Sequence, residues 1–378
     1  MANKKRSKQR AATSARSAHA RATPKPAGSD KAKPTSKLHH FVPQAYLRGF
    51  ADAREQITAI KLPGEKRFTS AVRNVAAQTH FYRVPGLDQP DLIEEILSGI
   101  ESDCMQALQA VERGVWPLPE EDRWKLGYFV SLQVVRGPDT RRTDEKIQGE
   151  MLRLQIGANG RDAFATDLTE ALGRPATEEE VERYWREAVQ PGGPSITIPM
   201  HEHITSMMET SQELLKYIVG RPWQLFRFDK RSLITSDSPV GLIHDYEDTD
   251  MFHGVGFMTA WGISFPVTRK LGILMLDPLQ VVEGVPAGDS LIFERGDKVR
   301  AGGYDAVRAG TTALAKFFNV HTSHNSREYL YHHPDDAASV PDELPEPQLT
   351  NMTMGGGLSD HEWDGTPMYG EPPRELEA

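Results

Sequence analysis

The spacing of the apolar residues changes along the chain, and this change limits the folds that the chain can adopt. From about residue 90 to 220 apolar residues recur every three or four positions, which is typical of amphipathic helices. From about 221 to 295 they alternate at every second position, which is typical of strands. A helical block between β regions predicts an α+β fold, in which the central helices pack against antiparallel β elements from the N- and C-terminal parts.

Individual elements can be placed from this spacing and from the residues that cap helices. Thr177 and Glu180 have the spacing of a capping box at a helix start. Gly137-Pro138 is expected to end the second helix of the block. Helices are expected at about 43–49, 91–114, 119–136, 139–158, 162–172, 177–189, 200–219 and 303–318. Strands are expected at 57–60 with 66–69, at 223–228 with 233–235, at 262–267 with 271–276, and at 290–294 and 328–331.

The two ends of the chain carry opposite charge, while the whole chain has a net charge of −9. Residues 1–37 hold eleven Lys and Arg against one acid, about +10, with few large apolar side chains. This composition predicts a disordered basic tail. Residues 334–378 hold eleven acids, one base and seven prolines, and are expected to form an acidic, loosely packed tail. The folded domain is therefore expected at 38–333.

Composition also limits the partners and the compartment. The basic tail could hold RNA or DNA through phosphates, and the alternative is a solubilising or ribosome-proximal tail. The single cysteine, Cys104, allows no disulfide within the chain and no cysteine zinc site, which fits a reducing cytoplasm. No secretory signal is evident, and the longest apolar run, near Leu271–Leu276, is too short for a bilayer. We therefore expect a cytoplasmic protein without a membrane partner.

His39 and His40 stand just before Pro43 and Gln44, where a short helix is expected to begin. On an extended segment the two imidazoles point to opposite sides, so they are expected to have different roles. One could ligate a metal, act as a base or cap the helix. The alternative is that one of them is a packed core histidine.

Gln133 and Arg136 lie three residues apart at the end of the second helix, on one helix face. Arg136 could hold a phosphate or carboxylate in its planar fork, with Arg141 adding to the site. The alternative is that Arg136 only stabilises the C-terminal end of the helix dipole.

Asp237 and Asn319 follow expected elements. An acid at a strand end, as Asp237 is in Thr235-Ser236-Asp237-Ser238-Pro239, can hold a metal or orient a histidine. The alternative is an Asx-type turn. Asn319 follows the expected last helix and could cap it or face a site. The chain contains no Walker loop, no dinucleotide-binding glycine motif and no nucleophile elbow, which disfavours nucleotide-dependent enzymes and the usual esterases.

The segment His39–Phe50 resembles the opening motif of the bacterial DUF4238 family, a domain of unknown function. The resemblance covers roughly residues 38–332, although Ser238 stands where the family has Asn. It implies no established reaction. It implies that five polar residues at element ends converge on one site: His39, His40, Gln44, Arg136 and Asp237. Further residues also match the family pattern: Phe81-Tyr82, Gln133, Pro138, Phe265-Pro266 and Asn319.

Two functional hypotheses follow. The first is a metal-assisted phosphodiesterase or nuclease that acts on nucleic acid with Mg²⁺ or Mn²⁺. In it His39, His40, Gln44 and Asp237 are catalytic, with His40 and Asp237 on the metal, and Gln133, Arg136, Arg141 and Asn319 bind substrate. The segment His39-His40-x-x-Pro43 resembles the start of HNH endonucleases, whose module also needs a downstream Asn. The gap from His40 to Asn74, the candidate for that Asn, is long for such a module. The second hypothesis is a non-catalytic binding protein for an anionic ligand, in a defence or mobile-element module.

Overall fold

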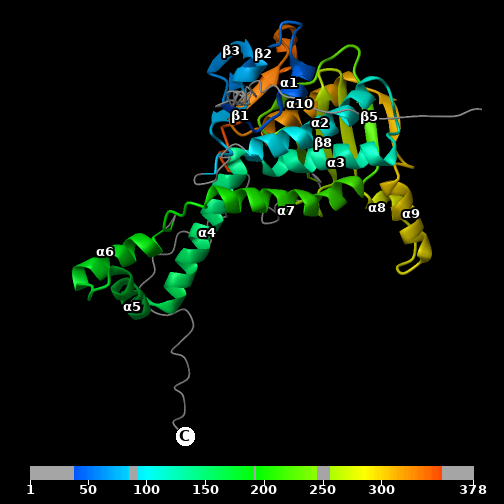
Figure 1. The fold of residues 1–378 in the computed structure, drawn as a ribbon. Coiled ribbons are helices and arrows are strands. Elements are labelled where there is room, and N and C mark those ends of the chain that lie inside the picture. The colour runs from blue at the N-terminus through cyan, green and yellow to red at the C-terminus, as the bar shows by residue number, and fades with distance from the viewer. Residues whose placement is uncertain (1–37, 85–91, 191–192, 245–255, 351–378) are drawn as a thin grey trace, which may run out of the picture. The chain divides into compact units, whose positions relative to one another are not determined.

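The computed structural model describes residues 38–84, 92–190, 193–244 and 256–350, all within one compact unit, Lys37–Ala378. The expected basic tail and residues 351–378 of the expected acidic tail lie outside the described residues. The chain combines a central group of helices with antiparallel and mixed sheets (Figure 1). The predicted α+β fold is confirmed.

The helical block occupies the predicted part of the chain. Thr177 and Glu180 form the predicted capping box, each side chain bonding the other residue's backbone N–H. Three helices of the block place apolar residues in the core, as the spacing predicted: Leu92–Glu112, Glu120–Val135 and Met200–Val219. Pro138–Asn159, in contrast, buries mainly polar residues. The helices of the block are α2 (Leu92–Glu112), α3 (Glu120–Val135), α4 (Pro138–Asn159), α5 (Arg161–Leu172), α6 (Glu178–Val189) and α7 (Met200–Val219).

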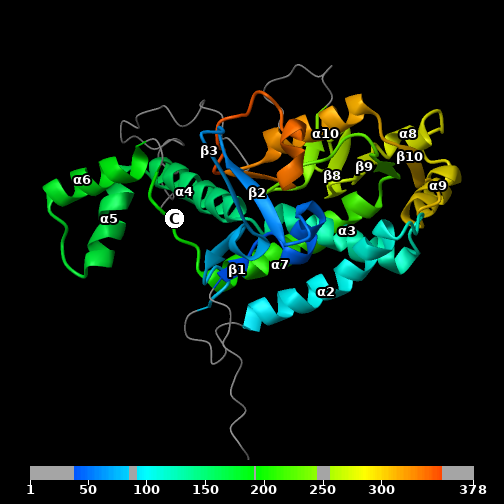
Figure 2. The same ribbon diagram turned by 90° about the horizontal axis from the view of Figure 1, so that it is seen from above.

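Helices α3 and α7 run side by side beneath the largest sheet (Figures 1 and 2). Gly127 of α3 permits their close approach, because a Cβ there would lie 2.7 Å from Cγ1 of Val219 in α7. Tyr128 of α3 accepts a hydrogen bond from Ser211 of α7 at 3.4 Å. The two helices therefore form one layer against which the sheet packs.

The largest sheet has five strands in the order β10-β5-β9-β8-β7, with only β10 and β5 parallel. Side chains alternate between the two faces of this sheet, and each face packs against a different layer of helices. Phe265 contacts Phe129 of α3, while Phe226 contacts Phe318 on the opposite face. The strands are β5 (Trp223–Arg227), β7 (Gly241–Ile243), β8 (Gly262–Thr268), β9 (Leu271–Leu276) and β10 (Ala306–Ala309), and Phe318 belongs to α10 (Thr312–Asn325).

A second sheet joins the N-terminal hairpin to the end of the domain, in the order β3-β2-β11-β6. Its strands are β2 (Gln56–Lys61), β3 (Lys66–Ala71), β6 (Thr235–Ser236) and β11 (Tyr329–His332). The pair β1 (Leu38–His40) and β4 (Ala77–Thr79) forms a small third sheet. Short elements complete the fold: α1 (Gln44–Leu47), η1 (Arg48–Phe50), η2 (Val72–Asn74), α8 (Leu279–Val282), α9 (Ser290–Arg300) and η3 (Pro334–Ser339).

The predicted pairing of 223–228 with 233–235 is wrong. β5 pairs with β9 and β10, whereas β6 pairs with β11 in the other sheet. The chain between them crosses the β8–β9 turn, where Phe228 N–H donates to the Lys270 carbonyl and Leu233 N–H to the Arg269 carbonyl, both at 2.9 Å. These bonds carry the chain from one sheet to the next, and no hairpin forms.

Two predictions near the C-terminal part are also wrong. Residues 290–294 begin α9, because Asp289 caps the helix by accepting the Leu291 N–H, and a short apolar run fits a strand or a helix equally well. The closing helix, expected at 303–318, starts at Thr312, where Thr311 accepts the Leu314 N–H. The residues before it form β10 instead, and Asn319 lies inside α10.

Candidate functional site

Arg136 anchors the N-terminal segment to the helical block. Its guanidinium is 1% exposed and donates to the His40 carbonyl at 2.7 Å, to Glu101 Oε1 at 2.7 Å and to Tyr82 Oη at 3.2 Å. These partners occupy all three nitrogens of the guanidinium. Arg136 and His40 thus lie together, but the contact is made through a backbone carbonyl and joins β1 to α3.

The two adjacent histidines have different surroundings. His39 is fully buried, and its Nδ1 accepts the Tyr82 N–H at 3.0 Å. His40 Nε2 lies 3.2 Å from the Arg73 carbonyl, so that nitrogen donates the hydrogen bond. Burial lowers the pKa of His40, and the neighbouring Arg136 charge lowers it further. The His40 imidazole is therefore neutral at pH 7.

Gln133 is the predicted residue whose side chain is least satisfied. It is 4% exposed, and neither Oε1 nor Nε2 has a hydrogen-bond partner among the described residues. It lies one turn after Phe129, which contacts Tyr46, and three residues before Arg136. Gln133 thus lies on the face of α3 that meets the His40–Tyr46 segment. Gln44, in this segment, is half-buried at the start of α1.

Asp237 holds the start of β11. Its Oδ1 accepts the Arg327 N–H at 2.8 Å, and its Oδ2 accepts the N–H groups of Glu328 and Tyr329 at 2.7 and 2.9 Å. Burial raises the pKa of this carboxyl to about 6, against the three N–H donors, which lower it. Among the residues that the structure describes, no group of three or more His, Cys, Asp or Glu side chains is arranged to hold a metal ion.

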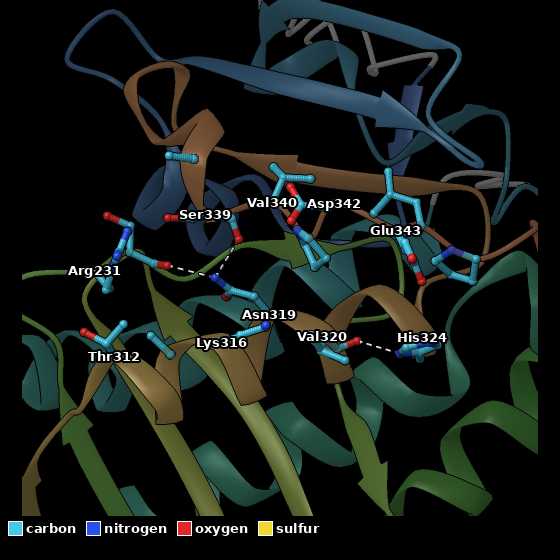
Figure 3. A pocket seen from close by; sticks show the side chains of 16 residues that line it. Arg231, Thr312, Lys316, Asn319, Val320, His324, Ser339, Val340, Asp342 and Glu343 are labelled. Atoms are coloured by element: carbon cyan, nitrogen blue, oxygen red, sulfur yellow. Dashed lines mark hydrogen bonds between the residues drawn. The ribbon is translucent and has the colours of Figure 1, made fainter.

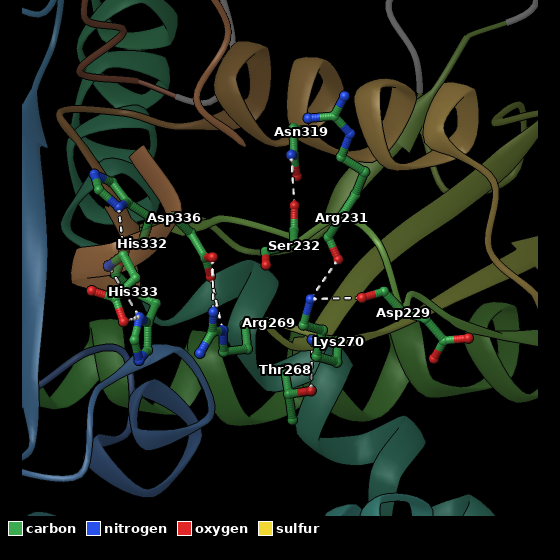
Figure 4. Close-up of polar contacts among 11 residues, drawn as sticks. Asp229, Arg231, Ser232, Thr268, Arg269, Lys270, Asn319, His332, His333 and Asp336 are labelled. Atoms are coloured by element: carbon green, nitrogen blue, oxygen red, sulfur yellow. Dashed lines mark hydrogen bonds and ion pairs between the residues drawn. The ribbon is translucent and has the colours of Figure 1, made fainter. Parts of the chain in front are cut away.

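Arg141 and Asn319 lie on separate elements. Arg141 is half-buried on α4, where its Nε contacts Glu145 Oε1 at 3.4 Å. Asn319 is 4% exposed, and its Oδ1 accepts the Ile234 N–H at 3.1 Å. Its Nδ2 donates to the carbonyls of Ser232 and Ser339 at 3.0 and 2.8 Å. Asn319 therefore joins α10 to two backbone segments, 232–234 (Figure 4) and the end of η3, and both contribute residues to the hollow described next.

A groove of about 660 Å³ lies between α10 and the segment that follows η3 (Figure 3). We call it the α10 groove. One wall carries Arg231 and Lys316, whose side chains make no hydrogen bond or ion pair with any described residue. The amide of Asn319 lies between the walls. The groove is lined by Arg231, Ser232, Thr312, Ala315, Lys316, Asn319, Val320, His324 and residues 338–345.

A second hollow of about 240 Å³ shares Arg231 and Thr312 with the α10 groove. It is also lined by Lys230 and Thr311, at the N-terminal end of α10. The positive end of the helix dipole adds to the charge of Arg231 there. Arg231 is thus the cation at which the two hollows meet, while the Asp229 carboxylate also lines the second hollow.

The walls of the α10 groove are held by polar contacts below it (Figure 4). Lys270 Nζ donates to the carbonyls of Asp229 and Arg231 at 3.4 and 3.0 Å, which fixes the turn that carries Arg231. Arg269 holds η3 through a bidentate pair with Asp336, both bonds at 2.8 Å. The groove thus has a preformed base.

Sequence reasoning found Asn319 and missed Arg231 and Lys316. An Arg in an Asp-Lys-Arg turn and a Lys on a helix are ordinary surface residues in a sequence. Only the packing of α10 against residues 338–345 makes them line one hollow. The contacts of Arg136 with Tyr82 and Glu101 were missed as well, because these residues come from distant segments.

A family model described as "Protein of unknown function (DUF4238)" matches residues 38–336. The chain belongs to the DUF4238 family. No curated protein and no solved structure matches the chain. The DUF4238 match contains the cationic wall of the groove and ends inside η3, so residues 338–345 form a wall that lies beyond it.

The sequence predicted that the DUF4238 chain has no membrane partner. None of the helices that the structure describes has the length and apolar character needed to cross a bilayer.

Proposed function

We propose that the protein binds an anionic, phosphate-bearing ligand in the α10 groove and acts as a non-catalytic binding protein. The observation that carries this proposal is the pair Arg231 and Lys316, two cations without described partners that line one hollow. The volume of about 660 Å³ is typical of ligand sites. Arg231 can form a bidentate pair with phosphate, and Lys316 adds a second charge.

Metal-assisted cleavage of nucleic acid stays a prediction. It needs Arg136 to clamp a phosphate and Asp237 to ligate Mg²⁺ or Mn²⁺, and both side chains bond protein groups. The hydrogen bond of His40 favours it: because Nε2 donates to the Arg73 carbonyl, Nδ1 is the ring nitrogen that can accept a proton. Cleavage assays with either metal, on wild type and on His40→Ala, test this. Equal cleavage by both proteins would remove His40 from the mechanism.

We also propose that the protein works in the cytoplasm of a bacterium, in a defence or mobile-element module. Cys104 is buried, and burial raises the pKa of its thiol to about 12. The thiol therefore stays protonated and unreactive. Support for a reducing compartment comes from the single cysteine, which cannot form a disulfide within the chain.

Inorganic phosphate is the simplest probe of the groove. We expect phosphate to raise the melting temperature of the wild type more than chloride at equal ionic strength. The double variant Arg231→Met/Lys316→Met should bind phosphate about tenfold more weakly, because two charge-assisted bonds are lost. Calorimetric titration measures the affinity.

The control has the same change of charge elsewhere. Arg113→Met/Lys146→Met removes two exposed cations outside the groove and should bind phosphate like the wild type. If both double variants lose the same affinity, the effect is general electrostatics and the groove is not the site. If phosphate does not bind the wild type, the proposed function fails.

A further inference from the structure

The charges of the α10 groove are separated along its length. Figure 3 places Arg231 and Thr312 at one end and His324 with Glu343 at the other. Thr312 and His324 are twelve residues apart on α10, which corresponds to about 18 Å along the helix axis. Lys316 lies one turn from Thr312, so both cations belong to the same half of the groove.

The acidic half is formed by Asp342, near the middle of the groove in Figure 3, and by Glu343, toward the His324 end. Both carboxylates are exposed, and neither pairs with a cation among the described residues. Opposite charges thus stand in one hollow without pairing across it. A ligand that carries only negative charge would leave these two carboxylates without a partner and would be repelled by them.

The segment with the carboxylates is anchored on both sides. Val340 and Leu344 pack against the apolar cluster of Ile60, Leu62, Ile234 and Leu330. Pro341 and Pro345 restrict the backbone of the same segment. Because the wall is fixed, Asp342 and Glu343 keep their distance from Arg231 and are available to a ligand.

We infer that the natural ligand is a short zwitterionic peptide that lies along the groove. Its phosphoryl or carboxylate group binds at Arg231 and Lys316, and its Lys or Arg side chain binds at Asp342 and Glu343. A groove of about 18 Å matches an extended peptide of about five residues. This inference rests on the proposed function and adds the cationic end of the ligand.

The test uses blocked five-residue peptides with phosphoserine at one end, lysine at the other and alanine between them, in both orders. Glutamate in place of phosphoserine distinguishes a phosphoryl from a carboxylate ligand. Norleucine in place of lysine removes the positive charge and keeps the length. Fluorescence anisotropy measures binding of each peptide to the full chain. We expect the better of the two orders to lose about tenfold in affinity when lysine is replaced by norleucine.

The variant Asp342→Asn/Glu343→Gln should change the affinities for two ligands in opposite directions. It should weaken the zwitterionic peptide about tenfold, yet bind inorganic phosphate as well as the wild type or more tightly. A misfolded variant would lose both ligands, so the opposite signs exclude that explanation. The matched control Glu179→Gln/Glu187→Gln on α6 should change neither.

The outcomes separate the inference from the proposed function. If phosphate binds but norleucine costs no affinity, the acidic half does not bind a cation and the inference is overturned. If inorganic phosphate does not bind the wild type, the proposed function itself fails, and the inference that rests on it fails as well. If only the phosphoserine peptides bind, the anionic group is phosphoryl and the inference stands in its narrower form.

Discussion

Two buried titratable residues respond to pH in opposite directions. Burial raises the pKa of Asp237 to about 6 and lowers that of His203 to about 4. Between pH 4 and 6 folded Asp237 holds a proton that the unfolded chain has lost, so its contribution to stability falls as pH rises. Unfolded His203 gains its proton below pH 6.5 while the folded residue stays neutral, so its contribution falls as pH falls. The two effects oppose each other in the same range.

Removing either residue should expose the effect of the other. We expect Asp237→Asn to make stability rise more steeply from pH 4 to 6, and His203→Leu to make it rise less steeply. Each shift of about two pKa units corresponds to about 3 kcal/mol over the range. Urea unfolding at several pH values measures both profiles. Profiles parallel to that of the wild type would show that neither residue is buried as described.

The variant at position 237 also loses stability at every pH. An amide in place of the carboxylate would point its NH₂ at one of the N–H groups of Arg327, Glu328 or Tyr329. Leaving such donors without an acceptor costs about 1–3 kcal/mol. His201→Leu, which changes an exposed histidine on the same helix as His203, serves as the control for that substitution.

At the level of elements, local signals gave the helices and could not give the strand pairing. The capping box at Thr177 and the break at Gly137-Pro138 act within one turn, so they can be seen in the sequence. The pairing of β6 with β11 joins residues nearly a hundred positions apart and depends on tertiary packing. The same limit applies to the groove, whose walls meet only after α10 has packed.

Arg136 illustrates how a polar signature can belong to the scaffold. The sequence left two interpretations open: a planar fork that binds phosphate or carboxylate, or a charge that only stabilises the helix dipole. In the fold Arg136 is buried and links α3 to β1 and α2. Asp237 and Asn319 likewise satisfy backbone groups of other segments. Polar residues at the ends of elements therefore marked the places where segments meet. They did not show which side chains face a ligand.

Loss of Arg136 should therefore unfold the domain more readily than loss of a groove cation. We expect Arg136→Met to lower the free energy of unfolding by about 3–5 kcal/mol, because Glu101 and the His40 carbonyl lose a buried partner. Arg231→Met, at an exposed position, should change it by at most about 0.5 kcal/mol. Denaturant unfolding measures both. Equal effects would contradict the scaffold role of Arg136.

At the level of the whole molecule, charge is divided between the ends and the groove. Residues 1–37 carry about +10 by counting, and they lie outside the described residues. We propose that any binding to nucleic acid uses this tail and depends strongly on salt. The α10 groove is mixed in charge and suits a small ligand. The two activities are therefore separable.

Deletion of residues 1–37 should weaken binding to a generic RNA or DNA oligonucleotide and flatten its dependence on salt, because phosphate contacts release counterions. Filter binding between about 50 and 200 mM salt measures the slope. Deletion of residues 351–378, which removes acidic residues, is the control and should not weaken binding. An unchanged slope after loss of the basic tail would place the nucleic-acid contacts elsewhere. Phosphate binding in the groove should survive both deletions.

The end of the family match inside η3 has an evolutionary consequence. The cationic wall of the groove belongs to the shared domain, whereas the acidic wall belongs to residues 338–345 beyond it. The Asn319 amide, which bonds Ser339, can hold any residue there because it reads only a carbonyl. A relative could thus exchange the second wall and keep the first. Ligand preference would then diverge through a short terminal segment, while the fold that presents positions 231 and 316 is kept.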